Sequence, residues 1–252
     1  MRIDAPSEHQ VFQLLALWKT AFGEHGGFWE LFRDTAFRTD HCRCIRAEGQ
    51  VLAALCWLDC ACSGQTFAYI YAVVTHPEHR GQGLCRELLA DTHAHLTALG
   101  YSGVLLVPEQ EGLRQMYRRL GYRDCTTVTE FSCAAAETAV PLRAIGPAEY
   151  GRLRRAFLPE GGVVQEGRSL DFLAAQAQFF AGGSFLLAAY REEGILHGME
   201  LLGSREAAPG IVTALGCETG HFRTPGEEKP FAMLHPLTAN ALMPQYFGFA
   251  FD

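Results

Sequence analysis

The segment VVTHPEHRGQGLCRELL, residues 73–89, places a glycine-rich turn between a β-branched run and an amphipathic helix. The first turn of a helix leaves backbone N–H groups without partners, and the helix dipole adds partial positive charge there. Gly81 and Gly83 would let the backbone approach an anion closely because neither residue carries a Cβ. Arg80 adds a cation beside the turn. The combination predicts phosphate binding, although a lone Gly-x-Gly also occurs in simple strand–helix turns.

Tyr117 is a second residue that could take part in chemistry. It lies on the next predicted helix, within the run Met116–Tyr122. A phenol beside a sulfur leaving group can donate a proton while the bond to sulfur breaks. A tyrosine at this place is explained equally well as a core aromatic of an amphipathic helix. Tyr117 is therefore a candidate general acid with a structural alternative.

At this spacing and in this order, the two segments resemble the motifs of the GNAT superfamily of N-acetyltransferases. The family's first motif, Gln/Arg-x-x-Gly-x-Gly/Ala, is similar to Arg80–Cys85, although Cys85 replaces the last small residue. The second motif has a tyrosine four residues before a Gly-aromatic pair, as in Tyr117 and Gly121–Tyr122. The resemblance covers roughly residues 5–132.

The resemblance implies a mixed, mostly antiparallel sheet that splays after the strand Thr66–Thr75, with acetyl-CoA as co-substrate in the splay. The pantetheine would pair with one strand end, where a backbone N–H would stabilise the oxyanion, and the pyrophosphate would lie on the glycine turn. Tyr117 would be the catalytic acid for the departing thiolate. The implied cofactor-binding residues are Val73, Val74, Thr75, Arg80, Gly81, Gln82, Gly83, Leu84, Cys85 and Arg86.

Two further positions bear on the splay. Pro108 ends the partner strand, and because it has no N–H to close the ladder it would help to hold the strands apart. The asparagine that often precedes the second motif's helix in the family is absent, and Gln110 stands near its place. One contact to the pantetheine arm is therefore missing from the expected set.

The general base is left open. Many family members carry a glutamate on the strand before the phosphate loop, but Thr66–Thr75 has no carboxylate. Several side chains near the expected site remain as alternatives, although a histidine beside a proline is usually a loop residue and glutamates are usually solvated. These candidates are Tyr69, Tyr71, His76, Glu109 and Glu111.

Helix and strand patterns alternate along the first half and predict an α/β (α+β) fold of the GNAT type. Glu48–Gln50 reads as the tight turn of a hairpin. The expected helices are 11–22, 27–37, 84–99 and 113–120, and the expected strands are 41–48, 51–62, 66–75, 104–107 and 126–132.

The second half repeats this order weakly, with a hairpin turn at Glu193–Gly194. Arg223–Gly226 lies where the second half would have its glycine turn. Pro225 lacks the backbone N–H that a phosphate would need there, and the two glutamates that follow would repel phosphate. We therefore predict a smaller, degenerate GNAT-like unit that walls the acceptor pocket and binds no CoA; two unrelated domains are the alternative. The expected helices of this half are 150–157 and 171–180, and the expected strands are 185–190, 195–202 and 211–217. The two predicted units are residues 1–136 and 137–252.

The aromatic end of the chain, Pro244–Asp252, predicts a buried strand. Some relatives with duplicated units, the N-myristoyltransferases among them, use a C-terminal carboxylate as base. This resemblance makes Asp252 a further candidate, with termination at the surface as the alternative.

The composition excludes several classes of protein. Of 252 residues, 48% are apolar and 19% charged, which is ordinary for one or two globular domains, and the formal charge is −7. No basic cluster suggests a nucleic-acid or anionic-membrane partner. The apolar runs are too short for a membrane helix and none forms a leader, so we expect a cytoplasmic protein.

Nine cysteines occur, and the pairs Cys42/Cys44 and Cys60/Cys62 each place two side chains on one strand face. Without a secretory context we expect free thiols in the core. A metal site is the alternative, but its usual Cys-x-x-Cys spacing is absent, so we predict no metal.

The resemblance implies direct transfer of an acetyl group from acetyl-CoA to a primary amine of a small molecule or peptide. The alternatives are a non-catalytic acetyl-CoA sensor, transfer of another acyl or aminoacyl group, and a purely structural protein. The sequence leaves open the amine, the acyl chain length and whether the protein is a homodimer.

Overall fold

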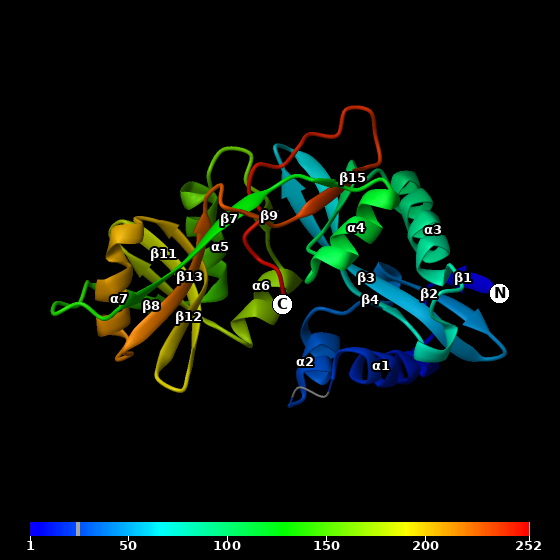
Figure 1. Cartoon of the computed structure of the whole chain (residues 1–252), viewed down its shortest axis with the longest axis horizontal. Helices are drawn as coiled ribbons and strands as arrows, with labels where there is room; N and C mark the ends of the chain where they lie inside the picture. Colours follow the sequence, from blue (N-terminus) through cyan, green and yellow to red (C-terminus); the bar gives the residue numbers. More distant parts are fainter. Residues whose placement is uncertain (24–25, 252) are drawn as a thin grey trace.

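The computed structural model describes residues 1–23 and 26–251, which form two sheets side by side, each with helices packed on it (Figure 1). This arrangement confirms the predicted GNAT-like α/β fold. The first sheet contains, in spatial order, β1 (Arg2–Asp4), β2 (Cys42–Ala47), β3 (Gln50–Cys62), β4 (Gln65–Thr75), β5 (Gly103–Leu106), β15 (Met233–Pro236) and β6 (Arg123–Asp124), with β9 (Val164–Gln165) paired to β3.

Helices cover both faces of this sheet. Along β3, Ala54, Cys56 and Leu58 face one core, while Leu55 and Trp57 face the other. This period-two alternation follows from the pleat, and both faces are apolar because both are covered. Helices α1 (Glu8–Phe22) and α2 (Phe28–Thr35) pack on the first face, and α3 (Leu84–Ala98) and α4 (Glu111–Arg119) pack on the second (Figure 1).

The second sheet is covered by α5 (Pro147–Phe157) and α6 (Arg168–Ala174) on one face and by α7 (Ala208–Ala214) on the other. Its strands are, in spatial order, β14 (Lys229–Pro230), β7 (Thr127–Ala134), β13 (Thr219–Pro225), β12 (Ile195–Gly203), β11 (Phe185–Glu192), β10 (Gln178–Gly182) and β8 (Leu142–Ile145). Three short 3₁₀ turns, Thr39–His41, Pro77–His79 and Arg205–Ala207, complete the elements.

The echo between the halves is visible in the backbone. The turn at Glu48–Gly49 has φ angles of 51° and 82°, and the turn at Glu193–Gly194 has 49° and 82°. Two consecutive positive φ values are typical of the two-residue hairpin turn that matches strand twist. The echo fails at the predicted strand 211–217, where α7 and the turn after it occupy Ala208–Cys217. The predicted helix 171–180 is also shorter, since the chain enters β10 at Gln178.

The two sheets exchange strands. β7 lies in the second sheet, paired with β13, and β15 returns to the first sheet between β5 and β6. Figure 1 shows β7 crossing from one sheet to the other and β15 beside α4. The expected boundary between residues 136 and 137 falls after β7, so the division into 1–136 and 137–252 remains a prediction about chain segments.

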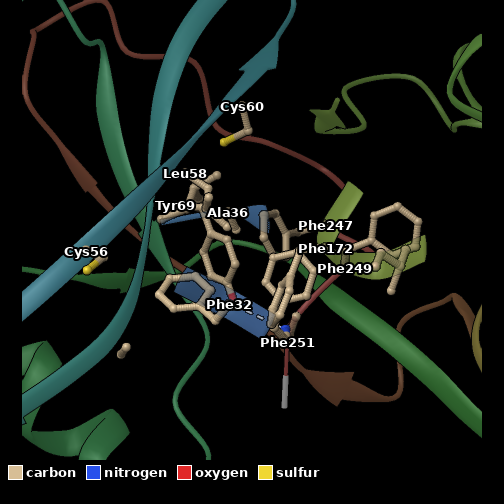
Figure 2. Close-up of a cluster of buried hydrophobic side chains, with 14 of the residues drawn as sticks. Phe32, Ala36, Cys56, Leu58, Cys60, Tyr69, Phe172, Phe247, Phe249 and Phe251 are labelled. Carbon is tan, nitrogen blue, oxygen red and sulfur yellow. Dashed lines mark hydrogen bonds between the residues drawn. The ribbon is translucent and has the colours of Figure 1, made fainter. Parts of the chain in front are cut away.

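The aromatic end of the chain is buried, as expected, but it is not a strand. Only an isolated bridge between Gly162 and Tyr246 pairs it with other backbone. The rings of Phe247 and Phe251 pack against Tyr69 of β4, with centroids 4.8 and 6.0 Å from the tyrosine ring (Figure 2). The segment is therefore held by the packing of its side chains and by hydrogen bonds from its backbone, without joining a sheet. Asp252 lies outside the described residues.

All nine cysteines are free thiols, and the pairs Cys42/Cys44 and Cys60/Cys62 lie buried in the same core. Among residues 1–23 and 26–251, no three His, Cys, Asp or Glu side chains gather as metal ligands would. In the same part of the chain, no helix has the length and hydropathy needed to span a bilayer.

Candidate active site

A cavity of about 620 Å³ opens where β4 and β5 separate. The two strands pair in parallel from Phe67–Tyr69 to Gly103–Leu105, and β4 then continues beside β3 to Thr75. β5 ends at Leu106, and Pro108 is buried in the cavity wall. Because proline has no N–H, it cannot extend the ladder toward β4. The splay expected from the resemblance is therefore present at the predicted strand.

A β-bulge lies on β4 at the splay. Ala72 has φ of 54°, an uncommon value for a residue with a Cβ, and the register to β3 shifts at this point. The indole N–H of Trp18 donates a 3.1 Å hydrogen bond to the Ala72 carbonyl and secures the strained residue. Val73, the next residue, lies in the cavity wall. Bulges often re-aim backbone groups beside functional sites.

The glycine turn runs into α3 as the sequence predicted. Gly81 and Gly83 have φ of 75° and 83°, in the left-handed region that glycine adopts at low cost. No side chain from the described residues caps α3, so its first N–H groups point outward without a side-chain acceptor. Gln82 and Arg86 are exposed at this end. An anion would find donors and partial positive charge here.

Among the other residues predicted to bind the cofactor, some expose their side chains and others bury them. Arg80 is exposed, and its Nε donates a 3.4 Å bond to the Thr75 carbonyl, which places the guanidinium between the turn and the end of β4. Val74 is buried and pairs with Ala54 of β3, while the side chain of Leu84 is buried in the core. For these two residues only the backbone is available for a ligand.

Tyr117 lines the same cavity from α4, with 6% of its surface exposed. No described residue forms a hydrogen bond with its hydroxyl, and its ring stacks edge-on against Tyr122 at 5.4 Å. Burial raises the pKa of Tyr117, and the nearby Cys85 thiol adds to the shift. Burial also raises the pKa of Cys85. Both groups therefore keep their protons at neutral pH.

The structure separates the candidate bases into two sets. Tyr69, Tyr71 and Glu109 line the cavity. His76 lies outside the lining, and its Nδ1 accepts from the backbone N–H of Glu78. Glu111 also lies outside, forming an ion pair of 3.1 Å with Arg118. All site roles, including those of the cofactor-binding residues and Tyr117, remain predictions.

The lining residues that were not anticipated as site residues include Phe22, Phe28, Trp29, Ala250 and Phe251. Phe22 ends α1, Phe28 and Trp29 begin α2, and Ala250 and Phe251 belong to the end of the chain. The signal available in the sequence was the density of aromatic residues in these segments, because ligand pockets are lined mostly by hydrophobic and aromatic side chains.

The second unit has a parallel pair at the equivalent place, β12 with β13, but its splay is closed. Thr224 is buried and donates a 2.8 Å bond to the Leu201 carbonyl across the gap. β14 and β15 follow in place of a helix, so no helix N-terminus follows Gly226. The described residues thus offer no counterpart of the glycine turn and α3 in this half.

Comparisons with known proteins agree with this geometry. Residues 2–125 match the family model for an acetyltransferase (GNAT) domain. The N-terminal half of this chain is a GNAT acetyltransferase domain. The match contains both the glycine turn and Tyr117, and it confirms the resemblance seen in the two motifs. No curated protein matches the chain.

Solved structures of GNAT proteins share the fold over nearly the whole chain. A GCN5-related N-acetyltransferase from Kribbella flavida is 20% identical, with a TM-score of 0.74 over 95% of this chain and 73% of that one. A second, from Anabaena variabilis, is 16% identical, with a TM-score of 0.75 over 94% and 73%. A tandem GNAT protein from the clavulanic acid biosynthesis pathway is 11% identical, with a TM-score of 0.57 over 95% and 99%. The GNAT domain and its smaller second unit thus have tandem structural neighbours.

Proposed function

We propose that this protein transfers an acetyl group from acetyl-CoA directly to a primary amine of a small molecule or peptide. The observation that carries the proposal is one continuous path from the α3 N-terminus, past the bulge of β4, to the cavity beside Tyr117. Its elements supply an anion site, an open strand edge and a proton donor, in that order. Coenzyme A presents phosphates, an amide-bearing arm and a thioester in the same order.

The residues along this path fit such a co-substrate. Gly81 and Gly83 leave the N–H groups of the turn uncovered, and Arg80 can offset phosphate charge. The β4 backbone past Tyr69 has no partner in β5, so it can receive an amide-bearing arm as a further strand. The thioester supplies the activated acyl group when acetyl-CoA is bound.

Two groups of the chain then serve the transfer. The backbone N–H groups at the bulge, around Val73, would donate to the oxygen that gains charge as the amine attacks, an interaction worth ~3 kcal/mol in other acyl transfers. The protonated hydroxyl of Tyr117 would donate to the sulfur as the C–S bond breaks. The C–N bond forms as the amine attacks, and the nitrogen gives its proton to solvent or a base. The C–S bond then breaks as the carbonyl re-forms, and the thiol leaves with the proton from Tyr117.

Titration calorimetry with CoA tests the proposal, together with an assay of thiol release from acetyl-CoA in the presence of amines. We expect one CoA per chain, because Thr224 closes the equivalent gap in the second unit. Thiol release should depend on the amine. A stoichiometry of two, or binding without any amine-dependent release, would contradict the proposed activity; the second result would favour a sensor.

A further inference from the structure

Aromatic rings from α1, α2, β4 and the chain end line part of the cavity. Phe22 and Phe28 flank Trp29, with ring centroids 5.4 and 5.0 Å from the indole. The rings of Tyr71 and Phe251 meet at 5.8 Å, and Phe172 joins Phe28 to Phe251 with centroids 5.4 and 5.0 Å from them. Phe22, Phe28, Trp29, Tyr71 and Phe251 all line the cavity, and Trp29 and Phe251 are only 4% and 7% exposed. A ligand in contact with these rings would exchange water for aromatic surface.

Charged side chains are scarce in this lining. Of residues 1–23 and 26–251, Glu109 is the one carboxylate that lines the cavity, and no lysine, arginine or histidine does so. Glu109 follows Pro108 on the β5 side, whereas the aromatic rings belong to α1, α2, β4 and the chain end. A polycation placed among these rings would lose its hydration, and the described lining offers it an ion pair only at Glu109, so its binding would be costly. A single amine on an apolar carrier would lose far less.

The same surroundings would help the chemistry. Desolvation disfavours the charged form of an amine and lowers its pKa. An amine bound among these rings would therefore be neutral more often than in water, and only the neutral form can attack the thioester. This effect offers a reason why β4 needs no carboxylate to serve as base.

The chain-end wall of this pocket is fixed in place by the second unit. The backbone of Phe249 is held from both sides by Gln165, whose amide donates to its carbonyl at 2.9 Å and accepts from its N–H at 3.3 Å. Tyr246 donates to Glu200 at 3.0 Å, and Glu200 is paired with Arg154 in the buried interior. Phe251 lies two residues after Phe249 and packs on Tyr69 (Figure 2). A preorganised wall binds a rigid ring at a low cost in conformational entropy.

We infer that the acceptor is a primary amine carried on an aromatic or similarly bulky apolar group, which packs against the lining rings of Phe22, Trp29 and Phe251. This inference rests on the proposed function, and it deepens it by naming the substrate class. Polyamines, amino sugars and small hydroxylated amines are poor acceptors on this account.

Kinetics with 2-phenylethylamine, ethanolamine and spermidine test the inference, together with titrations that follow tryptophan fluorescence because Trp29 lies in the pocket. Phe22→Ala is the test variant, since Phe22 is 39% exposed and its loss should leave the fold intact. Phe12→Ala is the matched control on the same helix, where Phe12 is 70% exposed and outside the cavity lining.

We expect 2-phenylethylamine to have the highest kcat/KM of the three amines. Phe22→Ala should raise its KM about three- to tenfold, the usual range for losing one aromatic contact, with unchanged CoA affinity. Phe12→Ala should change neither value. Preference for spermidine or ethanolamine, or an unchanged KM in Phe22→Ala, overturns the inference.

The fluorescence titration separates this inference from the proposed function. If CoA does not bind, the proposed function fails, but saturable quenching by 2-phenylethylamine that weakens in Phe22→Ala still supports the aromatic acceptor site. Absence of such quenching overturns the inference, whatever CoA does. Tighter binding of octanoyl-CoA than of acetyl-CoA that is lost in Phe22→Ala also overturns it, because the rings would then hold an acyl chain.

Discussion

At the residue scale, Tyr117 is placed where a general acid would have to lie, and its hydroxyl is free to donate. It lies in the cavity wall where β4 and β5 separate, and no described residue hydrogen-bonds with its hydroxyl. Its pKa is raised by burial, so the proton stays on the phenol as the pH rises past the usual value. A core tyrosine would normally satisfy its hydroxyl with a protein partner. The geometry therefore favours the chemical role over the structural one.

Replacing Tyr117 by Phe should lower kcat at least ~10-fold, the lower part of the range for losing a general acid. The melting temperature should change little, because the ring and its contact with Tyr122 remain. In the wild type, the raised pKa means that this group should cause no loss of kcat between pH 7 and 9. Steady-state kinetics across that range, with thermal unfolding as control, measure both effects.

Two results would count against this role for Tyr117. Unchanged turnover with a good acceptor would mean that water or another group protonates the sulfur. A marked fall in stability would mean that the hydroxyl satisfies a buried partner, since losing such a bond typically costs ~1–3 kcal/mol.

At the element scale, α3 has a glycine with positive φ at each end, and the two glycines serve different purposes. Gly83 is the N-cap with φ of 83°, and Gly100 follows the helix with φ of 85°. Neither would crowd the protein if it carried a Cβ: the nearest atom to Gly83 would be the Arg86 guanidinium at 3.5 Å, and Gly100 faces open space. The two glycines therefore have the same left-handed backbone conformation, but only Gly83 lies at the proposed anion site.

Gly83→Val and Gly100→Val should each lose ~1–2 kcal/mol of stability, because a β-carbon in the left-handed region costs about that much. Only Gly83→Val should also lose CoA binding, since its side chain would stand where phosphate approaches the N–H groups. Calorimetry with CoA on both variants makes the comparison. Equal CoA affinity in the two would place the anion site elsewhere.

At the scale of the whole molecule, the two halves depend on each other's strands. β15, from the second half, fills the place between β5 and β6, and β7, from the first half, pairs with β13. The chain end also supplies Phe247 and Phe251 to the core around Tyr69. Removing either half would expose strand edges and apolar surface that the other covers.

A fragment of residues 1–136 should therefore not form a stable monomer, whereas the full chain should unfold in a single cooperative transition. Circular dichroism and calorimetry of fragment and full chain test this. Two separated transitions in the full chain, or a fragment that keeps its fold and its CoA affinity, would show that the halves are independent domains.

The sequence by itself determined the features that depend on local backbone chemistry. The sequence predicted the turn at Gly81 and Gly83 and the helix after it, because positive φ angles and a helix start without a side-chain cap require particular residues at particular spacings. The hairpin turn at Glu48–Gly49 followed from the same logic, and both motifs of the GNAT resemblance lie in such segments. The splay after Thr66–Thr75 came with the family resemblance.

Only the tertiary structure decided which distant segments meet. Strand pairing depends on which edges and apolar faces remain uncovered, and this is not encoded within any short window, so the exchange of β7 and β15 was not predictable. Residues 211–214 read as a strand but form a helix, because a short apolar run fits either element and packing decides. Phe251 lies 182 residues from Tyr69 in the sequence, yet its N–H donates to the Tyr69 hydroxyl and both residues line the cavity.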